Sequence, residues 1–170
     1  MKILILANKL ENLNEEKDST IFLIKKALEK RFSVFFSTFE NLSIKKNSGK
    51  IYAYADVRFL TKSQTFKTKN PFKIGTTKSI SLNSIDVILI RTDPPFNQNY
   101  LTATQILDFV NKKTLIINNQ SALRNFNEKM FSLKFPNFIP STLISSNKKE
   151  ITNFIKLQNE KVVLKPLNLM

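Results

Sequence analysis

The sequence is most informative through the residue types that it lacks. Its 170 residues include no cysteine and no histidine. The absence of cysteine excludes disulfides, thiolate metal sites and cysteine nucleophiles. The absence of histidine removes the usual general base and the commonest metal ligand. A Ser-His-Asp triad and a zinc site with imidazole ligands are therefore excluded within these 170 residues.

Glycine is almost as scarce, because Gly49 and Gly75 are the only two in the sequence. A Rossmann fingerprint or a Walker loop needs several closely spaced glycines, which let the backbone approach a phosphate. Neither motif is present. The sequence therefore disfavours a self-contained dinucleotide-binding or P-loop enzyme.

Long apolar runs are also missing. No stretch approaches the ~20 apolar residues that cross a bilayer. The apolar opening, Met1 to Leu6, is too short for a signal peptide, and no small-residue cleavage site follows it. We interpret it as a first strand, and we predict a cytoplasmic protein without a membrane partner.

Positive charge is abundant, with a formal net charge of +14. Such a balance raises the question of nucleic acid. Arginine occurs only at positions 31, 58, 91 and 124, so lysine supplies the rest of the charge. Lysine, asparagine, isoleucine and phenylalanine share A/T-rich codons, and a base-composition bias would raise all of them together. We predict no nucleic-acid partner; a basic nucleic-acid binder, with affinity that falls steeply with salt, stays open as an alternative.

Strand and helix patterns alternate along the first 120 residues. Short apolar runs predict strands, and apolar residues at helical spacing after a capping residue predict helices. The predicted strands are 2–6, 33–36, 86–91, 114–118, 141–145 and 162–166. The predicted helices are 20–31, 100–112, 121–126, 128–135 and one that begins near residue 147. This alternation predicts an α/β fold with a doubly wound, mainly parallel sheet.

Residues 44–80 interrupt the alternation. Asn47-Ser48-Gly49 lies between two strand-like runs and predicts a β-hairpin. Residues 61–80 are polar and rich in lysine and threonine, which predicts a long, partly mobile excursion.

The stretch from Asp86 to Phe96 is the strongest candidate for a site. Its four apolar residues indicate a strand buried on both faces, and Pro94 and Pro95 stop that strand. Arg91 and Asp93 are therefore predicted at the carboxyl end of a parallel strand, where ligands bind in open α/β sheets. The alternative is that both residues only stabilise a turn.

Two further groups of residues have both a functional and a structural interpretation. Asp18 and Ser19 lie at a predicted helix N-terminus, which favours a carboxylate or phosphate ligand, although simple capping explains them equally. Lys129 lies on a short predicted helix, and Lys165 lies in an apolar run. A lysine in such a run often faces an anion such as phosphate, but it can also point outward from an edge strand.

Several blocks of residues, which together span nearly the whole chain, resemble the prokaryotic glutathione synthetase family of the ATP-grasp superfamily. The most specific are Asp93-Pro94-Pro95-Phe96, within the 86–96 stretch, and the block Leu123-Arg124-Asn125-Phe126-Asn127-Glu128-Lys129. The others, in the family's order around them, are Asn12-Leu13-Asn14 with Lys17-Asp18-Ser19-Thr20, Tyr100 to Leu107, and Val163-Leu164-Lys165-Pro166-Leu167.

This resemblance implies a Rossmann-like, pre-ATP-grasp substrate-binding domain over residues 1–124. It implies the beginning of an ATP-grasp domain, truncated, over residues 125–170. The implied activity is a ligase that joins γ-glutamylcysteine to glycine through an acyl phosphate, with ATP and Mg²⁺. The resemblance also implies that the full-length family forms homo-oligomers.

The resemblance further implies roles for individual residues. Lys129 and Lys165 would bind the ATP phosphates. Arg91, Asp93, Asp18 and Ser19 would line the substrate side of the cleft. No residue is assigned to catalysis or to a metal, and the Mg²⁺ ligands are expected beyond residue 170.

The chain also departs from the family's pattern. The glycine-rich loop that follows Lys165-Pro166-Leu167 in the family is absent here, and Asn119-Gln120 replaces a common lysine and proline. We therefore expect these 170 residues to be an incomplete, inactive portion of a synthetase. The alternative is a non-catalytic α/β binding module that retains a peptide or carboxylate site.

Overall fold

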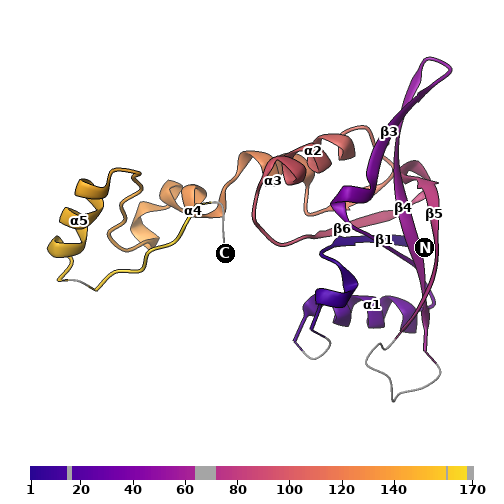
Figure 1. The fold of residues 1–170 in the computed structure, drawn as a ribbon, viewed down its shortest axis with the longest axis horizontal. Coiled ribbons are helices and arrows are strands. Elements are labelled where there is room, and N and C mark those ends of the chain that lie inside the picture. Colours follow the sequence, from indigo (N-terminus) through magenta and orange to yellow (C-terminus); the bar gives the residue numbers. More distant parts are fainter. Residues whose placement is uncertain (15–16, 64–71, 160, 168–170) are drawn as a thin grey trace. The chain divides into compact units, whose positions relative to one another are not determined.

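The structure, a computed structural model, describes residues 1–14, 17–63, 72–159 and 161–167 (Figure 1). The chain separates into two compact units, Met1–Asn125 and Phe126–Met170.

A seven-stranded mixed sheet forms the described part of the first unit, in the order β3-β4-β2-β1-β6-β7, with β5 paired to β4. The strands are β1 (Lys2–Ala7), β2 (Ser33–Ser37), β3 (Leu42–Asn47), β4 (Lys50–Lys62), β5 (Phe72–Ser81), β6 (Val87–Arg91) and β7 (Leu115–Ile117). Strands β2, β1, β6 and β7 are parallel, whereas β4 runs antiparallel to β2, β3 and β5. Six strands thus share one direction, which confirms the predicted mainly parallel α/β sheet.

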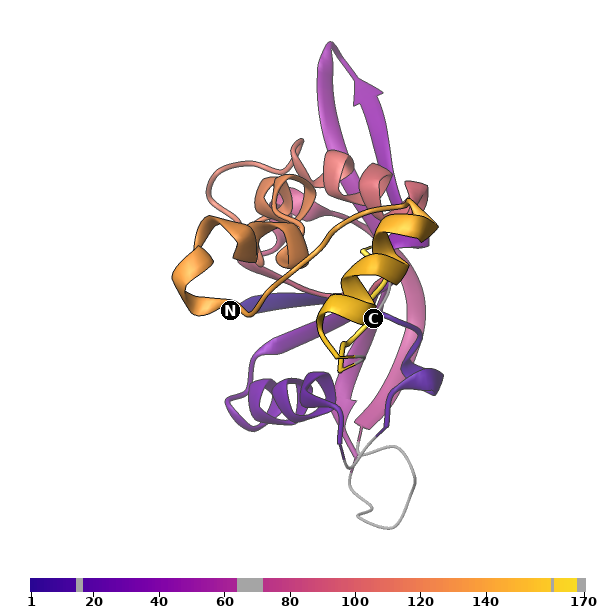
Figure 2. The ribbon, with the colours of Figure 1, turned by 90° about the vertical axis from the view of Figure 1, so that its left-hand side faces the viewer.

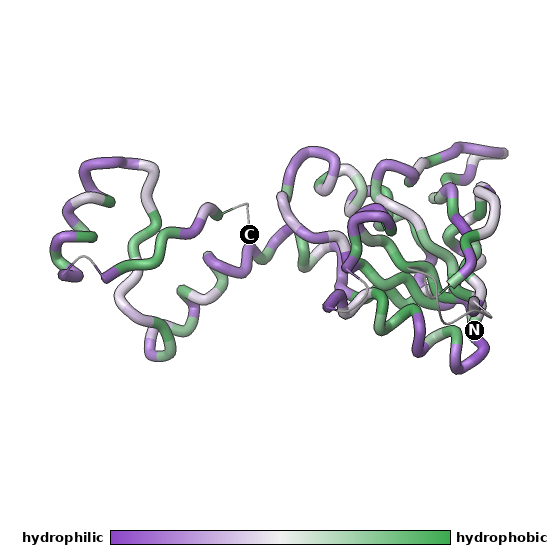
Figure 3. The backbone as a smooth tube through the Cα atoms, turned by 60° about the horizontal axis from the view of Figure 1, so that its bottom comes forward, coloured by the Kyte–Doolittle hydropathy of each residue, from purple (hydrophilic) through white to green (hydrophobic). Residues whose placement is uncertain are grey.

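Helices cover both faces of this sheet, as the doubly wound prediction requires (Figure 1). Helix α1 (Ser19–Glu29) packs its buried Ile21 and Ile24 with Ile3 and Ile5 of β1. Helix α2 (Gln98–Leu107) packs against the opposite face, where Leu4 and Leu6 contribute to a second cluster. Because strand side chains alternate between faces, β1 supplies residues to both clusters. Figure 3 shows that the hydrophobic segments of the chain follow the strands.

Capping residues set the starts of these helices. The Asp18 carboxylate accepts a hydrogen bond from the Thr20 amide at 2.7 Å, and the Asn97 side chain accepts one from the Tyr100 amide at 3.0 Å. Both helices were correctly predicted, but each ends earlier than its apolar pattern indicated.

Helix α3 (Gln120–Asn125) is held to the end of α2 by a shared carboxylate. The Arg124 guanidinium lies 2.7 Å from one Asp108 oxygen, and the Gln120 amide donates to the other at 3.2 Å. In this structure Arg124 therefore has a packing role within the first unit.

The predicted hairpin is confirmed as β3 and β4, which project beyond the helices (Figure 2). Ser48 and Gly49 have positive φ angles of 47° and 76°, as in a two-residue turn that matches the twist of the strands. Further along β4, a register shift lies between Arg58 and Leu60. A side chain at Gly75 of β5 would bring its Cβ to 3.2 Å from the Phe59 carbonyl oxygen, so the irregular pairing favours glycine there.

The predicted excursion over residues 61–80 is wrong where the structure describes it. Residues 61–62 complete β4, and residues 72–80 belong to β5, which pairs along β4. Residues 64–71 lie outside the described residues. The β5 segment was missed because its polar residues face solvent and its strand conformation depends on pairing with β4.

Of three further predicted strands, one is confirmed and two are wrong. The strand at 114–118 exists as β7, but it is an edge strand, and Leu115 and Ile117 are 57% and 44% exposed. The segments 141–145 and 162–166 are not strands. Their apolar residues gave the strand signal, but no described neighbouring strand supplies hydrogen-bond partners.

The second unit consists of short helices and turns in its described residues. It contains α4 (Glu128–Phe131), α5 (Lys148–Leu157) and two 3₁₀ turns, Ser132–Lys134 and Pro136–Phe138. Phe131 packs edge-on against Phe126 and Phe135, with ring centroids 5.0 and 5.8 Å away. No described side chain of this unit is fully buried, so its hydrophobic core is smaller than that of the first unit.

None of the helices in the described ranges is long and apolar enough to span a membrane.

The central position of β1 gives a test of the first unit's core. Leu4 is fully buried between the sheet and α2, so Leu4→Ala should lower the free energy of unfolding by about 2–5 kcal/mol, the usual cost of a buried leucine. Urea unfolding followed by circular dichroism measures this change. Leu115→Ala on the exposed edge strand is the control, and an equal loss in both variants would contradict the assigned core.

Candidate functional site

The candidate site lies where the parallel strands end. Strand β1 lies between β2 and β6 and is parallel to both, so Ala7, Ser37 and Arg91 end their strands at one edge of the sheet. The chain leaves β1 toward one face and β6 toward the other. Ligands of open α/β sheets bind in the crevice at such a switch point.

Arg91 reaches from this edge toward α1. Val87 and Leu89 pack with the α1 cluster, and Arg91 shares their face because side chains alternate along β6. Its guanidinium donates a 2.6 Å hydrogen bond to the Ser19 hydroxyl. Its Nε atom is buried and has no hydrogen-bond partner among the described residues. Two of the predicted site residues, 72 positions apart in the chain, are thus in direct contact.

Asp18 and Ser19 form the N-terminus of α1. Asp18 is the N-cap, so the structure gives its carboxylate a structural role. Ser19 is the first residue of the helix, and it is exposed. The free amides and the helix dipole at this position favour a negatively charged group close to Arg91.

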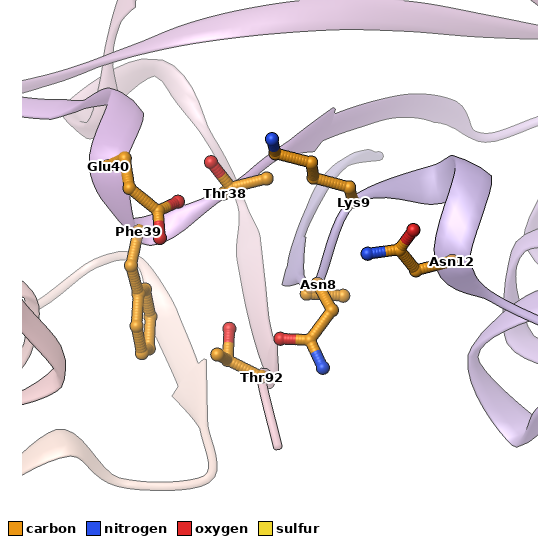
Figure 4. A pocket seen from close by; sticks show the side chains of 8 residues that line it. Asn8, Lys9, Asn12, Thr38, Phe39, Glu40 and Thr92 are labelled. Carbon is orange, nitrogen blue, oxygen red and sulfur yellow. The ribbon is translucent and has the colours of Figure 1, made fainter. Parts of the chain in front are cut away.

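Two adjoining cavities open at the same edge of the sheet, within the part of the first unit that is described. Their volumes are about 210 and 230 Å³. They share four lining residues: Asn8, Phe39, Glu40 and Thr92. Figure 4 shows the first cavity, with Lys9 and Asn12 on the β1 side and Thr38 and Glu40 on the β2 side.

Asp93 lines the second cavity together with Tyr100. The Asn8 amide donates a hydrogen bond to the Asp93 carboxylate at 3.5 Å, which connects the ends of β1 and β6. Burial raises the pKa of the Tyr100 phenol, and the negative charge of Asp93 raises it further. The predicted site residue Asp93 is therefore placed in a cavity, while Arg91 points toward α1.

Glu40 lies in both cavities and is kept ionised. A hydrogen bond from the Thr38 hydroxyl lowers the pKa of its carboxyl group, and the Glu40 backbone amide and the charge of Lys9 lower it too. Partial burial acts in the opposite direction. Near neutral pH, Glu40 therefore presents a negative charge to the cavities.

Lys129 and Lys165 belong to the second unit. The Lys129 ammonium lies 3.4 Å from the Leu167 carbonyl oxygen, which also accepts a 3.0 Å hydrogen bond from the Asn127 side chain. The segment from residue 161 to 167 is thereby held against the start of α4. Lys165 lies in this segment and is exposed. The ammonium groups of Lys129 and Lys165 can both donate hydrogen bonds to phosphate oxygens.

A magnesium site has no counterpart in the described ranges. They contain no group of three or more histidine, cysteine, aspartate or glutamate side chains close enough to hold a metal ion. Within these ranges, no residue is assigned to Mg²⁺.

Sequence reasoning missed the residues that follow β2. Thr38, Phe39 and Glu40 belong to no recognisable sequence motif. Their position directly after a parallel strand could have identified them. Residues that follow any of the parallel strands, not only β6, reach the same edge of the sheet. Asn8 and Thr92 follow β1 and β6 in the same way.

Comparisons with known proteins agree with this architecture. Residues 1–124 match the model of "Prokaryotic glutathione synthetase, N-terminal domain", and residues 128–170 match "Prokaryotic glutathione synthetase, ATP-grasp domain".

Similar curated proteins bear the same family name. A glutathione synthetase of Buchnera aphidicola subsp. Baizongia pistaciae is 34% identical over 166 residues, covering 96% of this chain and 49% of the relative. Another from Buchnera aphidicola subsp. Schizaphis graminum is 35% identical over 171 residues, covering 100% and 51%. One from Rhodopseudomonas palustris is 31% identical over 172 residues, covering 99% and 51%.

The chain spans about half the length of these curated relatives. Its first 124 residues match the family's amino-terminal domain and include the block around Asp93, while Lys129 lies within the region that matches the ATP-grasp domain. The chain therefore belongs to the prokaryotic glutathione synthetase family.

Proposed function

We propose that this chain contributes the peptide-binding side and two phosphate-binding lysines to an ATP-dependent ligase that joins γ-glutamylcysteine to glycine. The observation that carries the proposal is the 2.6 Å hydrogen bond between Arg91 and Ser19, at the strand-end edge where two cavities also open. Family membership supplies the reaction type.

Arg91 and Ser19 suit a carboxylate of the peptide substrate. Arginine presents several donors in a planar fork that matches carboxylate geometry. The Ser19 hydroxyl and the amides at the start of α1 add donors on the same side. The Arg91 Nε has no hydrogen-bond partner among the described residues, which supports a role of the guanidinium as a donor to a ligand.

Lys129 and Lys165 would contact the phosphates of ATP. When bound, ATP supplies the phosphoryl group that activates the peptide carboxylate, so that the glycine amine can displace phosphate. The lysines neutralise phosphate charge, and Lys129 also keeps the 161–167 segment in place through Leu167.

The proposed peptide site can be tested by removing the guanidinium group of Arg91. Arg91→Gln should weaken γ-glutamylcysteine binding roughly tenfold to hundredfold, because hydrogen bonds to charged groups contribute about 1.5–3 kcal/mol. Isothermal titration calorimetry or NMR titration of the 170-residue chain measures the change. Arg58→Gln is the matched control, since Arg58 pairs with Glu11 at 3.3 Å on an exposed surface. Equal affinities of Arg91→Gln and the unmodified chain would contradict the proposal.

The phosphate site can be tested at Lys165, whose exposure makes a folding defect improbable as the cause of an effect. Lys165→Gln should weaken ATP binding several-fold through the loss of one charge-assisted contact. Fluorescence titration with a nucleotide analogue measures this. Lys149→Gln on α5 is the control, and an equal decrease there would indicate only a general charge effect.

Activity of the 170 residues alone is a separate question. Because the chain spans half the length of its relatives, we expect substrate and nucleotide binding without detectable glutathione formation. A coupled assay of phosphate release with both peptide and glycine present tests this expectation. Glutathione formation by the purified chain would overturn it. A non-catalytic peptide-binding module is the second candidate, and it predicts peptide binding with no ATP binding.

A further inference from the structure

The second unit exposes apolar side chains to an extent that the first unit does not. Phe138, Leu157, Val163 and Leu164 are each at least 70% exposed. Among the described residues of the first unit, no large hydrophobic side chain is more than 58% exposed. The second unit therefore does not enclose its own apolar residues. Exposed apolar surface of this extent is typical of a site that binds another polypeptide.

Helix α5 has an apolar face that is only half covered. Ile151, Phe154 and Ile155 lie at helical spacing on this face, and each of them is half-buried. Leu157, at the end of the helix, is almost fully exposed. A helix of ten residues depends on the packing of its apolar face for most of its stability. A further layer against α5 would therefore stabilise it.

The segments 141–145 and 162–166 have unpaired backbone groups. No backbone amide or carbonyl of either segment forms a hydrogen bond with the part of the chain that the structure describes. Val162-Val163-Leu164 is nevertheless an apolar run of the kind found in strands that are covered on both faces. In a strand, Val163 and Leu164 would point to opposite faces. Apolar side chains beside unpaired backbone are the features that β-augmentation uses when a partner adds a strand.

The lengths of the relatives indicate what covers this surface. The match to the ATP-grasp domain begins at residue 128, so it lies within the second unit. The chain covers 49% and 51% of the two Buchnera relatives, and their other halves lie outside the match. In these relatives, the equivalent of the second unit is therefore joined to a further stretch of chain about as long as this whole chain.

We propose that the apolar surface of the second unit binds the carboxyl-terminal half of a glutathione synthetase, and that residues 162–166 pair with a strand of that half. This surface consists of Phe138, Leu157 and the segments 141–145 and 162–166. The proposal rests on family membership and not on the peptide and ATP sites proposed above. Pairing supplies the missing backbone hydrogen bonds, and burial of the exposed apolar side chains stabilises the contact.

Co-expression tests the binding. The partner is the carboxyl-terminal half of the synthetase of Buchnera aphidicola subsp. Schizaphis graminum, which is 35% identical over the matched part. Purification through a tag on the 170-residue chain should yield a 1:1 complex, measured by size-exclusion chromatography with light scattering. Leu164→Glu should reduce the recovered partner at least about tenfold, because it places an unpaired charge in an apolar contact.

Ile51→Glu is the matched control. Ile51 is also an exposed apolar residue, but it lies opposite Lys46 in the hairpin of the first unit. This variant introduces the same charge and should retain the complex in full. An equal loss of the complex in Leu164→Glu and Ile51→Glu would contradict the assigned surface.

Hydrogen exchange tests the strand. The amides of residues 162–165 should exchange at least about tenfold more slowly in the complex than in the 170-residue chain alone, because hydrogen-bonded amides are protected. The same comparison is made with a single chain in which a flexible linker joins the two halves. Protection in this joined chain supports the pairing even where the separate halves do not purify together, and unchanged exchange there would overturn the proposal.

Other occupants of the surface give different results. A second copy of this chain would produce a dimer in the absence of the partner, and Leu164→Glu would convert that dimer to a monomer. Coverage by the first unit would protect the amides of residues 162–165 in the chain alone. Either result would overturn the proposal. Because none of these measurements uses peptide or nucleotide, failure here is distinct from failure of the proposed ligand sites, which the Arg91→Gln and Lys165→Gln titrations decide.

Discussion

The parallel pairing of β1 with both β2 and β6 is the constraint on which the rest of the first unit depends. Ile3 to Ala7 are buried, and alternate residues supply the clusters under α1 and α2. The crossover through α1 brings the end of β2 beside the end of β1, and the parallel pairing of β6 with β1 brings the end of β6 to the same edge. Polar residues that follow these strands, such as Asn8, Thr38 and Thr92, line the cavities at this edge.

Much of this arrangement is readable from local sequence. The apolar runs of β1 and β6 and the caps Asp18 and Asn97 are short-range signals, and the structure follows them. Strand β5 depends on a partner strand, so its polar sequence gave no local signal. The opposite error occurred at Val163, which is 80% exposed although it lies in an apolar run. Apolar character indicates a preference for burial, whereas a strand also requires neighbouring backbone to pair with.

The candidate site also combines residues that local sequence indicates with residues that only the fold brings to the site. Arg91 and Asp93 were predictable because prolines mark the end of their strand, and Ser19 because it follows a capping residue. Residues 91 and 93 would share a face in a continuous strand, so their different surroundings depend on the end of β6 at Arg91, which spacing alone did not resolve. Glu40 could not be identified from sequence motifs. It becomes significant only when β2 is placed beside β1, since its residue type is common and its neighbours are unremarkable in the sequence.

Net charge and local charge have different roles in this protein. The excess of lysine produces a positive field over the molecule, which favours the approach of anionic ligands such as a peptide with two carboxylates. That field is screened over about 10 Å in salt and does not orient a ligand. Orientation needs charged groups held in fixed positions, and the strand-end edge has Arg91, hydrogen-bonded to Ser19 on the α1 side, and Glu40, which lines the cavities. The side chains at this edge are therefore more informative about a ligand than the overall balance of charge.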